Sequence, residues 1–310
     1  MSECETSQTG ITTPFSKFNS SYVQEDVTIV RPIKNVVIKT IEGIDQKVKS
    51  TSKTSEIDDV LKTDFRILDF HSGEFCILSS RSGMGKSAFA FTLMKQLAVE
   101  KKQPVGFISP GNFDDESIGQ RLISMCSGVD TCRLRTGFLR AADFNSVQEA
   151  ANKIYESPIE YYNEPNCSYE SVKEAMKIMV EKQHVRLIIV EGFEYLRELV
   201  DAEKQDYRET LEDLLMQFRF LATELSVPIM LVVDLPETNS DPLDEPRLLD
   251  FKKYMFIPYI ADKVIFVHRE PGQNKIIDDA TLYVAKNESG MTGLIPIKFD
   301  KKTCLFFEEK

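Results

Sequence analysis

The stretch "SSRSGMGKSAFAF", residues 79–91, decides the fold class of this chain. It joins the apolar run "FCILSS", a predicted buried strand, to "SAFAFTLMKQLA", a predicted helix. It is close to the phosphate-binding pattern G-x-x-x-x-G-K-[ST], with Ser80 in the position of the first glycine. Backbone N–H groups and the positive end of a helix meet at such a junction and favour a polyphosphate. The stretch therefore predicts a nucleotide site in an α/β domain.

Two residues of this loop have predictable roles. Lys86 is expected to reach the β and γ phosphates of ATP, and the hydroxyl of Ser87 to bind Mg²⁺. The string "GMGKSA" also fits a dinucleotide fingerprint, but that interpretation gives Lys86 no role and finds no acidic residue closing the next strand, "PVGFISP". A chance run of small residues is the other alternative. The predicted nucleotide-binding residues of the loop are Ser80, Arg81, Ser82, Gly83, Met84, Gly85, Lys86 and Ser87.

Apolar strands and amphipathic helices alternate through the middle of the chain. Strands are expected at 74–80, 104–110, 159–163, 185–193 and 227–233. Helices are expected at 87–102, 115–126, 141–157, 169–183 and 207–225. This alternation predicts a mostly parallel sheet covered by helices on both faces. Later strands, without intervening helices, predict an antiparallel edge at 262–270, 280–288, 293–300 and 303–309.

Composition narrows the functional classes. The net charge of −11 gives no support to broad nucleic-acid binding, which needs a local concentration of Lys and Arg. It does not exclude a narrow basic channel. The chain has no signal-like start and no run near the ~18 apolar residues of a membrane span, so a soluble, cytoplasmic protein is expected. The six scattered cysteines are expected to be buried free thiols, and the three histidines lack zinc-ligand spacing.

The first part of the chain differs from the rest. Residues 1–53 are rich in Ser, Thr, Lys and Gln, with "DVTIV" and "KNVVIKTI" as short apolar stretches. We expect a flexible tail or linker there. Residues 54–310 are expected to form the nucleotide-binding domain.

Several segments, in order, carry a family resemblance. "SSRSGMGKSAFAF" resembles the A-R-P-G-M-G-K-[ST]-A-F-A stretch of the DnaB-type replicative helicases, in which a small residue other than glycine occupies the first position. "LISMCSGVDTCRLRTGFL", "FLATELSVPIML" and "KNESGMTGLIPIKFDKKTCLFFE" are similar to later family segments, and "EPRLLDFKKYMFIPYIADKVIFVHRE", residues 245–270, matches without a gap. Recombinases and clock-type ATPases share the superfold, but they explain the phosphate loop and not the 245–270 stretch. The resemblance covers about 54–310.

The resemblance implies a RecA-like motor domain. Such domains work as a hexameric ring, with ATP between subunits and single-stranded DNA in the central channel. The expected partners are therefore further copies of this chain in a ring, or a replicative helicase. The resemblance also implies that Glu191, in "IIVEGFEYL", takes the place of the aspartate that holds Mg²⁺, and that Lys286, in "KNESG", contributes to a neighbour's ATP. Arg121 and Arg135 match polar positions of the family fold and are interpreted as structural.

Other positions depart from the motor. Gly111, in "FISPGNF", stands in place of the catalytic glutamate, so that a base would have to come from Asp114, Asp115 or Glu116 in a remodelled loop. Glu288 replaces the arginine of the hairpin, and loss of such an arginine removes a rate gain on the order of 10³-fold or more.

The region expected to couple ATP to DNA is acidic. Asp234 replaces the glutamine that senses the γ-phosphate, and an anion there is repelled by phosphate. The following loop, "DLPETNSDPLDEPR", carries five carboxylates against one arginine, which argues against direct strand binding.

Two functional hypotheses follow. The first is an ATP-dependent DNA helicase, or its motor domain, with divergent catalytic residues. The second is a helicase paralogue that binds ATP or ADP as a structural cofactor or switch and regulates or assembles a genuine ring. Residues that hold a nucleotide are retained and residues that cleave it are altered, and this pattern favours the second mechanism.

Overall fold

The structure is a computed structural model of the whole chain, and it describes residues 40–41, 60–111, 113–202, 206–236, 244–272 and 275–309. The chain divides into two units, Met1–Asp58 and Asp59–Lys310, and the fold given below is that of the second. Apart from residues 40–41, the predicted tail at 1–53 lies outside the described residues.

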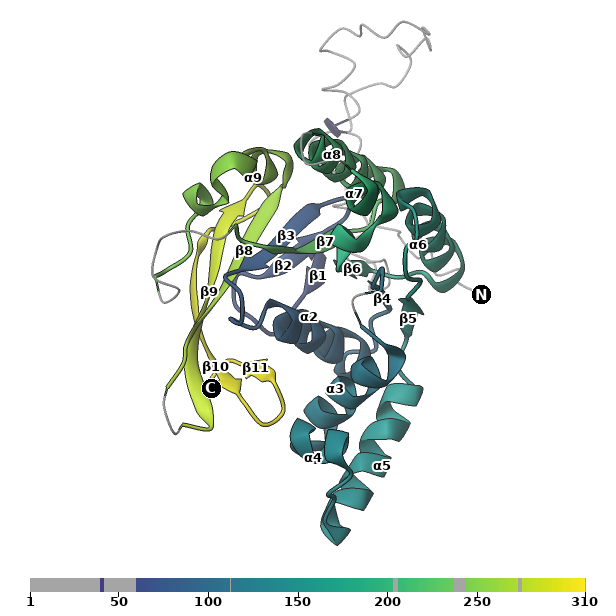
Figure 1. Cartoon of the computed structure of the whole chain (residues 1–310), viewed down its shortest axis with the longest axis vertical. Helices are drawn as coiled ribbons and strands as arrows, with labels where there is room; N and C mark the ends of the chain where they lie inside the picture. The colour runs from purple at the N-terminus through teal and green to yellow at the C-terminus, as the bar shows by residue number, and fades with distance from the viewer. Residues whose placement is uncertain are drawn as a thin grey trace, which may run out of the picture. The chain divides into compact units, whose positions relative to one another are not determined.

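A nine-stranded sheet in the order β11-β10-β9-β8-β3-β7-β6-β4-β5 forms the centre of this unit (Figure 1). From β8 to β5 all neighbouring strands are parallel. These six strands are β3 (Phe75–Ser80), β4 (Val105–Ile108), β5 (Ile159–Tyr162), β6 (Leu187–Glu191), β7 (Ile229–Asp234) and β8 (Lys263–Glu270). The predicted parallel α/β sheet is confirmed.

The antiparallel edge is also present. Strand β8 pairs in parallel with β3 on one side and antiparallel with β9 on the other, so the change of direction falls at β8. Beyond it the antiparallel strands are β9 (Ile277–Asn287), β10 (Gly293–Asp300) and β11 (Leu305–Phe307). A separate hairpin of β1 (Val60–Lys62) and β2 (Asp69–His71), which sequence patterns do not reveal, precedes the sheet.

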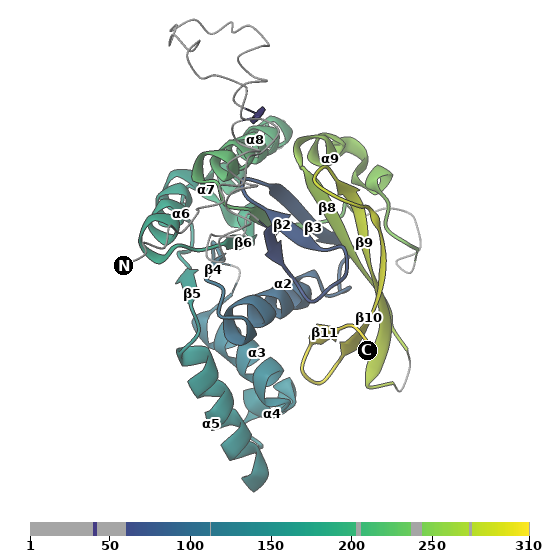
Figure 2. The ribbon, with the colours of Figure 1, turned by 180° about the vertical axis from the view of Figure 1, so that it is seen from behind.

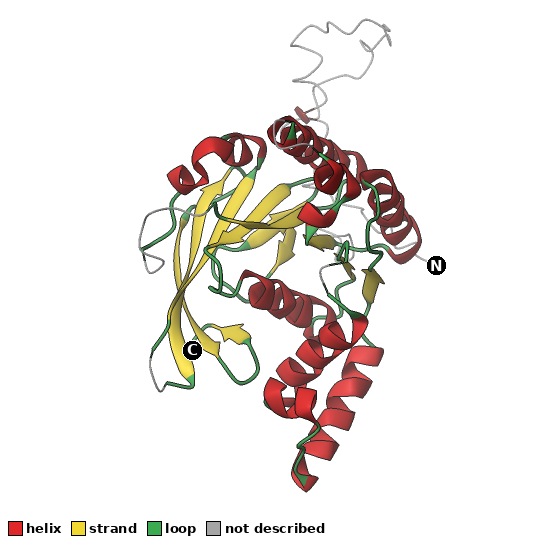
Figure 3. Ribbon diagram, viewed as in Figure 1, coloured by secondary structure: helices red, strands yellow, loops and turns green. Residues whose placement is uncertain are grey.

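Helices cover both faces of the sheet (Figures 2 and 3). The helices at predicted positions are α2 (Lys86–Met94), continued by the π-helical stretch η1 (Lys95–Glu100), then α3 (Asp115–Ser127), α5 (Ala141–Tyr155), α6 (Tyr169–Gln183) and α8 (Tyr207–Leu225). Short helical segments are additional: α4 (Thr131–Thr136), η2 (Phe193–Tyr195), α7 (Arg197–Asp201), η3 (Leu248–Tyr254) and α9 (Phe256–Ile260). Among the described residues, no helix is long and apolar enough to cross a membrane.

Two hydrophobic cores lie on opposite faces of the sheet. Successive residues of β3 alternate between them: Cys76 and Leu78 pack into the core that contains α2, and Phe75 and Ile77 into the core that contains α6 and α8. Side chains of a strand point to alternate faces, so a strand buried on both sides reads as a continuous apolar run. This is why "FCILSS" lacks the alternation of a half-exposed strand.

The prediction of buried cysteines is only partly right. Cys76 and Cys167 are buried, whereas Cys126 and Cys304 are half-buried, and Cys4 lies outside the described residues. Cys132 is exposed on α4, because that short helix buries none of its side chains.

Candidate nucleotide site

The phosphate loop connects β3 to α2 at the carboxyl edge of the parallel strands. Gly83 and Gly85 adopt positive φ angles of 76° and 98°, which glycine reaches without steric cost. Met84 N donates to Arg81 O at 3.2 Å and closes the turn before Lys86 begins α2. The predicted strand–loop–helix context of the motif is therefore present.

Residues from the antiparallel edge support this loop. The Arg269 guanidinium on β8 donates to Gly83 O at 3.0 Å. A Cβ added at Gly85 would lie 2.9 Å from the ring of Phe306 on β11, so the ring leaves room only for a glycine. Residues of β8 and β11, which come much later in the sequence, thus pack against the loop.

The loop residues divide into supporting and cleft-facing groups. Ser80 is fully buried and its hydroxyl donates to Arg81 O at 2.8 Å. The Arg81 guanidinium turns away to Asp250 Oδ2 at 3.2 Å and Asp244 O at 3.3 Å. Met84 is buried, whereas Ser82 and Gly83 are exposed. Of the eight predicted loop residues, Lys86 and Ser87 line the adjoining cleft.

This cleft has a volume of about 270 Å³ and is bounded by the ends of β6 and β7, the start of α2, and α3. Since parallel strands all end at the same edge of a sheet, residues far apart in the sequence converge there, where open α/β sheets bind their ligands. Its lining consists of Lys86, Ser87, Phe113, Arg121, Glu191, Gly192, Glu194, Tyr195, Val232 and Asp234.

Glu191 ends β6 as a buried carboxylate, with 3% of the residue exposed. Burial raises its pKa to about 7, against opposing effects of the Ser87 hydrogen bond, Lys86 and Arg121. Its Oε2 is buried without a hydrogen-bond partner. An orphaned carboxylate oxygen beside a hydroxyl matches the oxygen ligands that Mg²⁺ prefers. These residues fit the metal that the resemblance implies: Ser87 and Glu191 would hold it, and it would neutralise phosphate charge when bound.

Lys86 pairs with a carboxylate of its own chain. Its Nζ lies 2.6 Å from Asp234 Oδ1 at the end of β7. Strand register sets this approach, because Asp234 is opposite Ser80, the last residue of β3. The Asp234 side chain is 56% exposed and therefore reachable by a ligand.

Glu194 is a cleft residue that the motif search missed. It lies on η2, three residues after Glu191, and burial raises its pKa, with Asp234 adding to the effect and Lys86 opposing it. The only sequence signal is a second glutamate in "VEGFEYL", and nothing in that spacing shows that η2 turns it into the cleft.

Arg121 also lines the cleft, and this departs from a purely structural interpretation. Its guanidinium lies 5.0 Å from the ring centre of Phe113 and 5.6 Å from that of Phe91. The rings hold the Arg121 side chain in place on α3. Its positive charge acts against the rise in the pKa of Glu191. Arg135 is exposed on α4, where its guanidinium is 3.5 Å from Cys132 Sγ.

The three carboxylates at the start of α3 are engaged elsewhere. Asp114 caps α3 by accepting from Ser117 N, and Asp115 accepts from the Tyr161 hydroxyl. Glu116 accepts from the Gln120 amide at 2.8 Å. Of the described residues that line the cleft, none is one of these three carboxylates.

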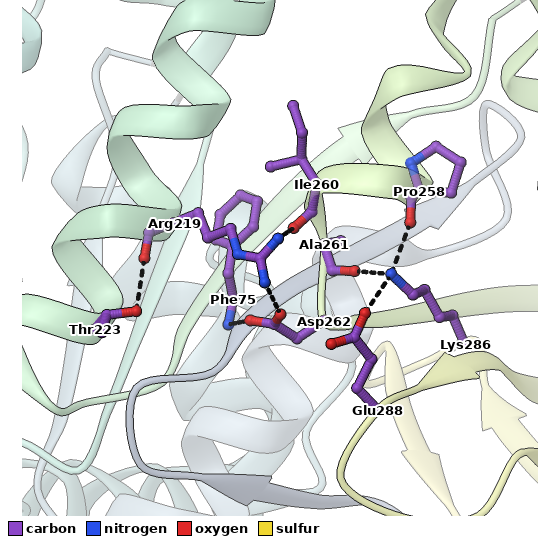
Figure 4. Close-up of polar contacts among 9 residues, drawn as sticks. All are labelled: Phe75, Arg219, Thr223, Pro258, Ile260, Ala261, Asp262, Lys286 and Glu288. Atoms are coloured by element: carbon purple, nitrogen blue, oxygen red, sulfur yellow. Dashed lines mark hydrogen bonds and ion pairs between the residues drawn. The ribbon is translucent and has the colours of Figure 1, made fainter. Parts of the chain in front are cut away.

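Lys286 lies at the opposite edge of the sheet from the phosphate loop. It pairs with Val264, near the start of β8, and its Nζ donates to Pro258 O at 3.1 Å and Ala261 O at 2.6 Å. Glu288 completes the contact at 2.8 Å (Figure 4). Within one chain, Lys286 is therefore part of the support of α9 and does not join the cleft.

Neighbouring groups reinforce that support. Arg219, on α8, donates to Ile260 O at 2.9 Å and to Asp262 Oδ1 at 2.7 Å. Asp262 also accepts from Phe75 N, at the start of β3 (Figure 4). The amino edge of the sheet is thus joined to α8 and α9 by polar contacts, while the carboxyl edge opens into the cleft.

Comparisons with known proteins agree with this architecture. The replicative DNA helicase DnaB of Treponema pallidum is 26% identical over 281 residues, which cover 88% of this chain and 60% of that protein. The corresponding protein of Rickettsia felis is 24% identical over 304 residues, covering 87% and 60%. The chain thus spans about 60% of the length of these relatives.

Solved structures show the same fold. One of them, an isolated ATPase domain, superposes with a TM-score of 0.73 at 18% identity, covering 91% of this chain and 100% of that one. A DnaB-like replicative helicase, studied with its interactions with primase, also gives 0.73 at 19% identity, covering 91% of this chain and 68% of that one.

The fold and the loop define a RecA-like P-loop protein. The model of the DnaB-like helicase C terminal domain matches residues 58–308. The chain belongs to that family.

Proposed function

We propose that this chain is a nucleotide-binding DnaB-like helicase module of DNA replication, with impaired hydrolysis and impaired coupling to DNA. Its ligands would be ATP or ADP with Mg²⁺, bound in the cleft between α2 and the ends of β6 and β7. The observation that carries the proposal is the convergence of Ser87 and the buried, orphaned Glu191 beside Lys86. A buried carboxylate oxygen without a partner is costly unless a ligand uses it, and a nucleotide-bound Mg²⁺ would do so.

The impairment is supported by what surrounds the phosphate loop. Gly111, at the position of the family's base, has a φ of 85° and a Cβ there would lie 3.1 Å from Pro165 Cα. Glu288, at the position where the family has an arginine, forms an ion pair with Lys286. A group that must take a proton from water has to lie within hydrogen-bond reach of it, and positive charge is needed for the transition state.

Weak coupling to DNA is supported by charge. Asp234 ends β7, and Asp244 and Glu245 are described residues of the segment that follows it. Carboxylates repel the phosphates of a DNA strand, whose binding depends on Lys and Arg. We therefore place single-stranded DNA as a weak partner at most.

Assembly is the second part of the proposal. The relatives are named as replicative helicases, and we propose that this chain associates with further copies in a ring or with a replicative helicase. In that setting it would act as a non-hydrolysing regulatory or assembly subunit that uses a nucleotide to hold its shape.

A working ATP-dependent DNA helicase is the second candidate, and Glu194 favours it. This carboxylate lines the cleft with Lys86 and Ser87, and its pKa is raised by burial. A raised pKa brings a carboxylate closer to the range in which it acts as a general base. Under this candidate Glu194 replaces the missing base.

One experiment separates the two. Nucleotide binding and single-turnover ATP hydrolysis are measured on the same preparation, with and without single-stranded DNA, beside Lys86→Ala and Glu194→Gln. Tight binding without turnover supports the first proposal. DNA-stimulated turnover that Glu194→Gln abolishes supports the second, and absence of binding in the parent protein contradicts both.

A further inference from the structure

We infer that Asp234 stands in for the terminal phosphate of a nucleoside triphosphate, so that the cleft selects a nucleoside diphosphate. The inference rests on the proposed function, because it names which nucleotide that site prefers. It makes Asp234 a specificity-determining residue.

The first observation is the partner of Lys86. In a phosphate loop the lysine reaches the β and γ phosphates. Here its Nζ lies 2.6 Å from Asp234 Oδ1, close enough for a charge-assisted hydrogen bond. The amine that would meet the terminal phosphate is therefore already bound to an anion of its own chain.

The second observation is that the backbone fixes where Asp234 stands. Its Cα is opposite that of Ser80 in the parallel pairing of β3 and β7. The next residue, Leu235, donates its N–H to Ser80 O at 3.1 Å. Asp234 is thus held beside the first residue of the phosphate loop by the sheet, and its carboxylate reaches Lys86 without leaving the strand.

The third observation is the balance of charge in the cleft. Its lining has two cations, Lys86 and Arg121, and three carboxylates, Glu191, Glu194 and Asp234. A Mg²⁺ held by Ser87 and Glu191 would offset part of this excess at those two residues, whereas Asp234 contacts Lys86. A triphosphate brings one more phosphate group than a diphosphate, and that group is the one that meets Asp234.

The energetic consequence differs between the two ligands. A diphosphate places its terminal phosphate in the loop and leaves Lys86 shared with Asp234. A triphosphate has to displace Asp234 from Lys86 and then lie against the displaced carboxylate, where like charges repel. The ratio of the affinities for the diphosphate and the triphosphate therefore measures how strongly the Asp234 carboxylate disfavours the third phosphate.

The test compares dissociation constants for ADP and for the non-hydrolysable β,γ-imido analogue of ATP, both with Mg²⁺, on the full chain. We expect the parent protein to bind ADP about tenfold more tightly or better. Asp234→Asn keeps the shape and removes the charge, and should tighten binding of the analogue by about tenfold while changing ADP binding by less than about threefold. Asp234→Gln should act in the same direction.

Asp64→Asn is the matched control. Asp64 Oδ1 pairs with Lys101 Nζ at 2.7 Å and its side chain is 54% exposed, so the pair resembles that of Asp234 but does not line the cleft. It should leave both constants unchanged. A parent protein that binds the analogue as tightly as ADP, or an Asp234→Asn variant that changes both constants equally, overturns the inference alone. If neither ligand binds the parent protein or Asp234→Asn, the proposed function fails with it.

Discussion

Lys86 and Lys286 are both lysines with carboxylate partners, and their surroundings give them different roles. Lys86 meets Asp234 at the mouth of an open cleft, and a ligand can compete for its amine. Lys286 donates to two backbone carbonyls as well as to Glu288. An ion pair in a cleft can be exchanged for a ligand, whereas an amine that satisfies backbone carbonyls stabilises the fold. This difference supports the proposed binding role of Lys86 and a structural role for Lys286 within one chain.

The largest expected effect is on binding. Lys86→Ala should weaken Mg²⁺-nucleotide binding by on the order of 10³-fold, since it removes the charge that meets the phosphates. Lys286→Ala should leave the affinity of the isolated chain unchanged. Titration with a fluorescent nucleotide measures both, and equal losses in the two variants would contradict the distinction.

The buried carboxylate of the cleft should make stability depend on pH. Glu191 has an ordinary pKa of 4.5 and one of about 7 in the folded chain. Between these values the folded state binds more protons than the unfolded state, so stability falls as pH rises from about 4.5 to about 7. Glu191→Gln should remove this pH-dependent loss of stability. The effect of the substitution on the free energy of unfolding should therefore be more favourable at about pH 8 than at about pH 4, by up to about 3 kcal/mol.

Urea unfolding of the metal-free protein at several pH values checks this. The matched control is Glu116→Gln, an exposed carboxylate on α3. If Glu191→Gln does not alter how the free energy of unfolding depends on pH, the pKa of Glu191 is not raised in the metal-free fold.

Lys286 should matter for stability. Lys286→Met keeps the aliphatic stem and removes the donor to Pro258 O and Ala261 O, which should cost about 1–2 kcal/mol. Lys298→Met is the control, because among the described residues Lys298 pairs only with the exposed carboxylates of Asp279 and Glu309, and this substitution should cost less stability than Lys286→Met. Denaturant midpoints compare the two variants. A loss of stability in Lys286→Met that is smaller than the loss in Lys298→Met would mean that Lys286 has no structural role.

The smallest effect concerns the missing base. Gly111→Glu restores the family residue but should not restore hydrolysis, because of the positive φ and the approach of Pro165. It should cost about 1 kcal/mol or more. Gly128→Glu, with a φ of 73° and nothing near its added Cβ, isolates the backbone cost from the crowding. Single-turnover hydrolysis and thermal unfolding measure the outcome. A gain of ATP turnover in Gly111→Glu would contradict the expectation that the backbone at this position prevents a working base.

The sequence predicted the parts of the site that lie close together in the chain. The loop at 80–87 is local, so its motif indicated Lys86 and Ser87 directly, and the resemblance added Glu191 at a strand end. Glu194 and Arg121 were not found as cleft residues, because their positions depend on how η2 and α3 pack around the ends of β6 and β7. Asp234 was recognised as an altered position, but its contact with Lys86 was not.

The sequence by itself therefore determined the α/β class, the strand order along the chain, and the presence of a phosphate loop, because apolar periodicity and glycine spacing are local properties. The tertiary structure alone decided which charges meet. Strand register placed Asp234 beside Lys86, and the pairing of β9 with β8 placed Lys286 at the other edge. Electrostatic interactions depend on distances in space, and the order of residues in the chain does not set those distances.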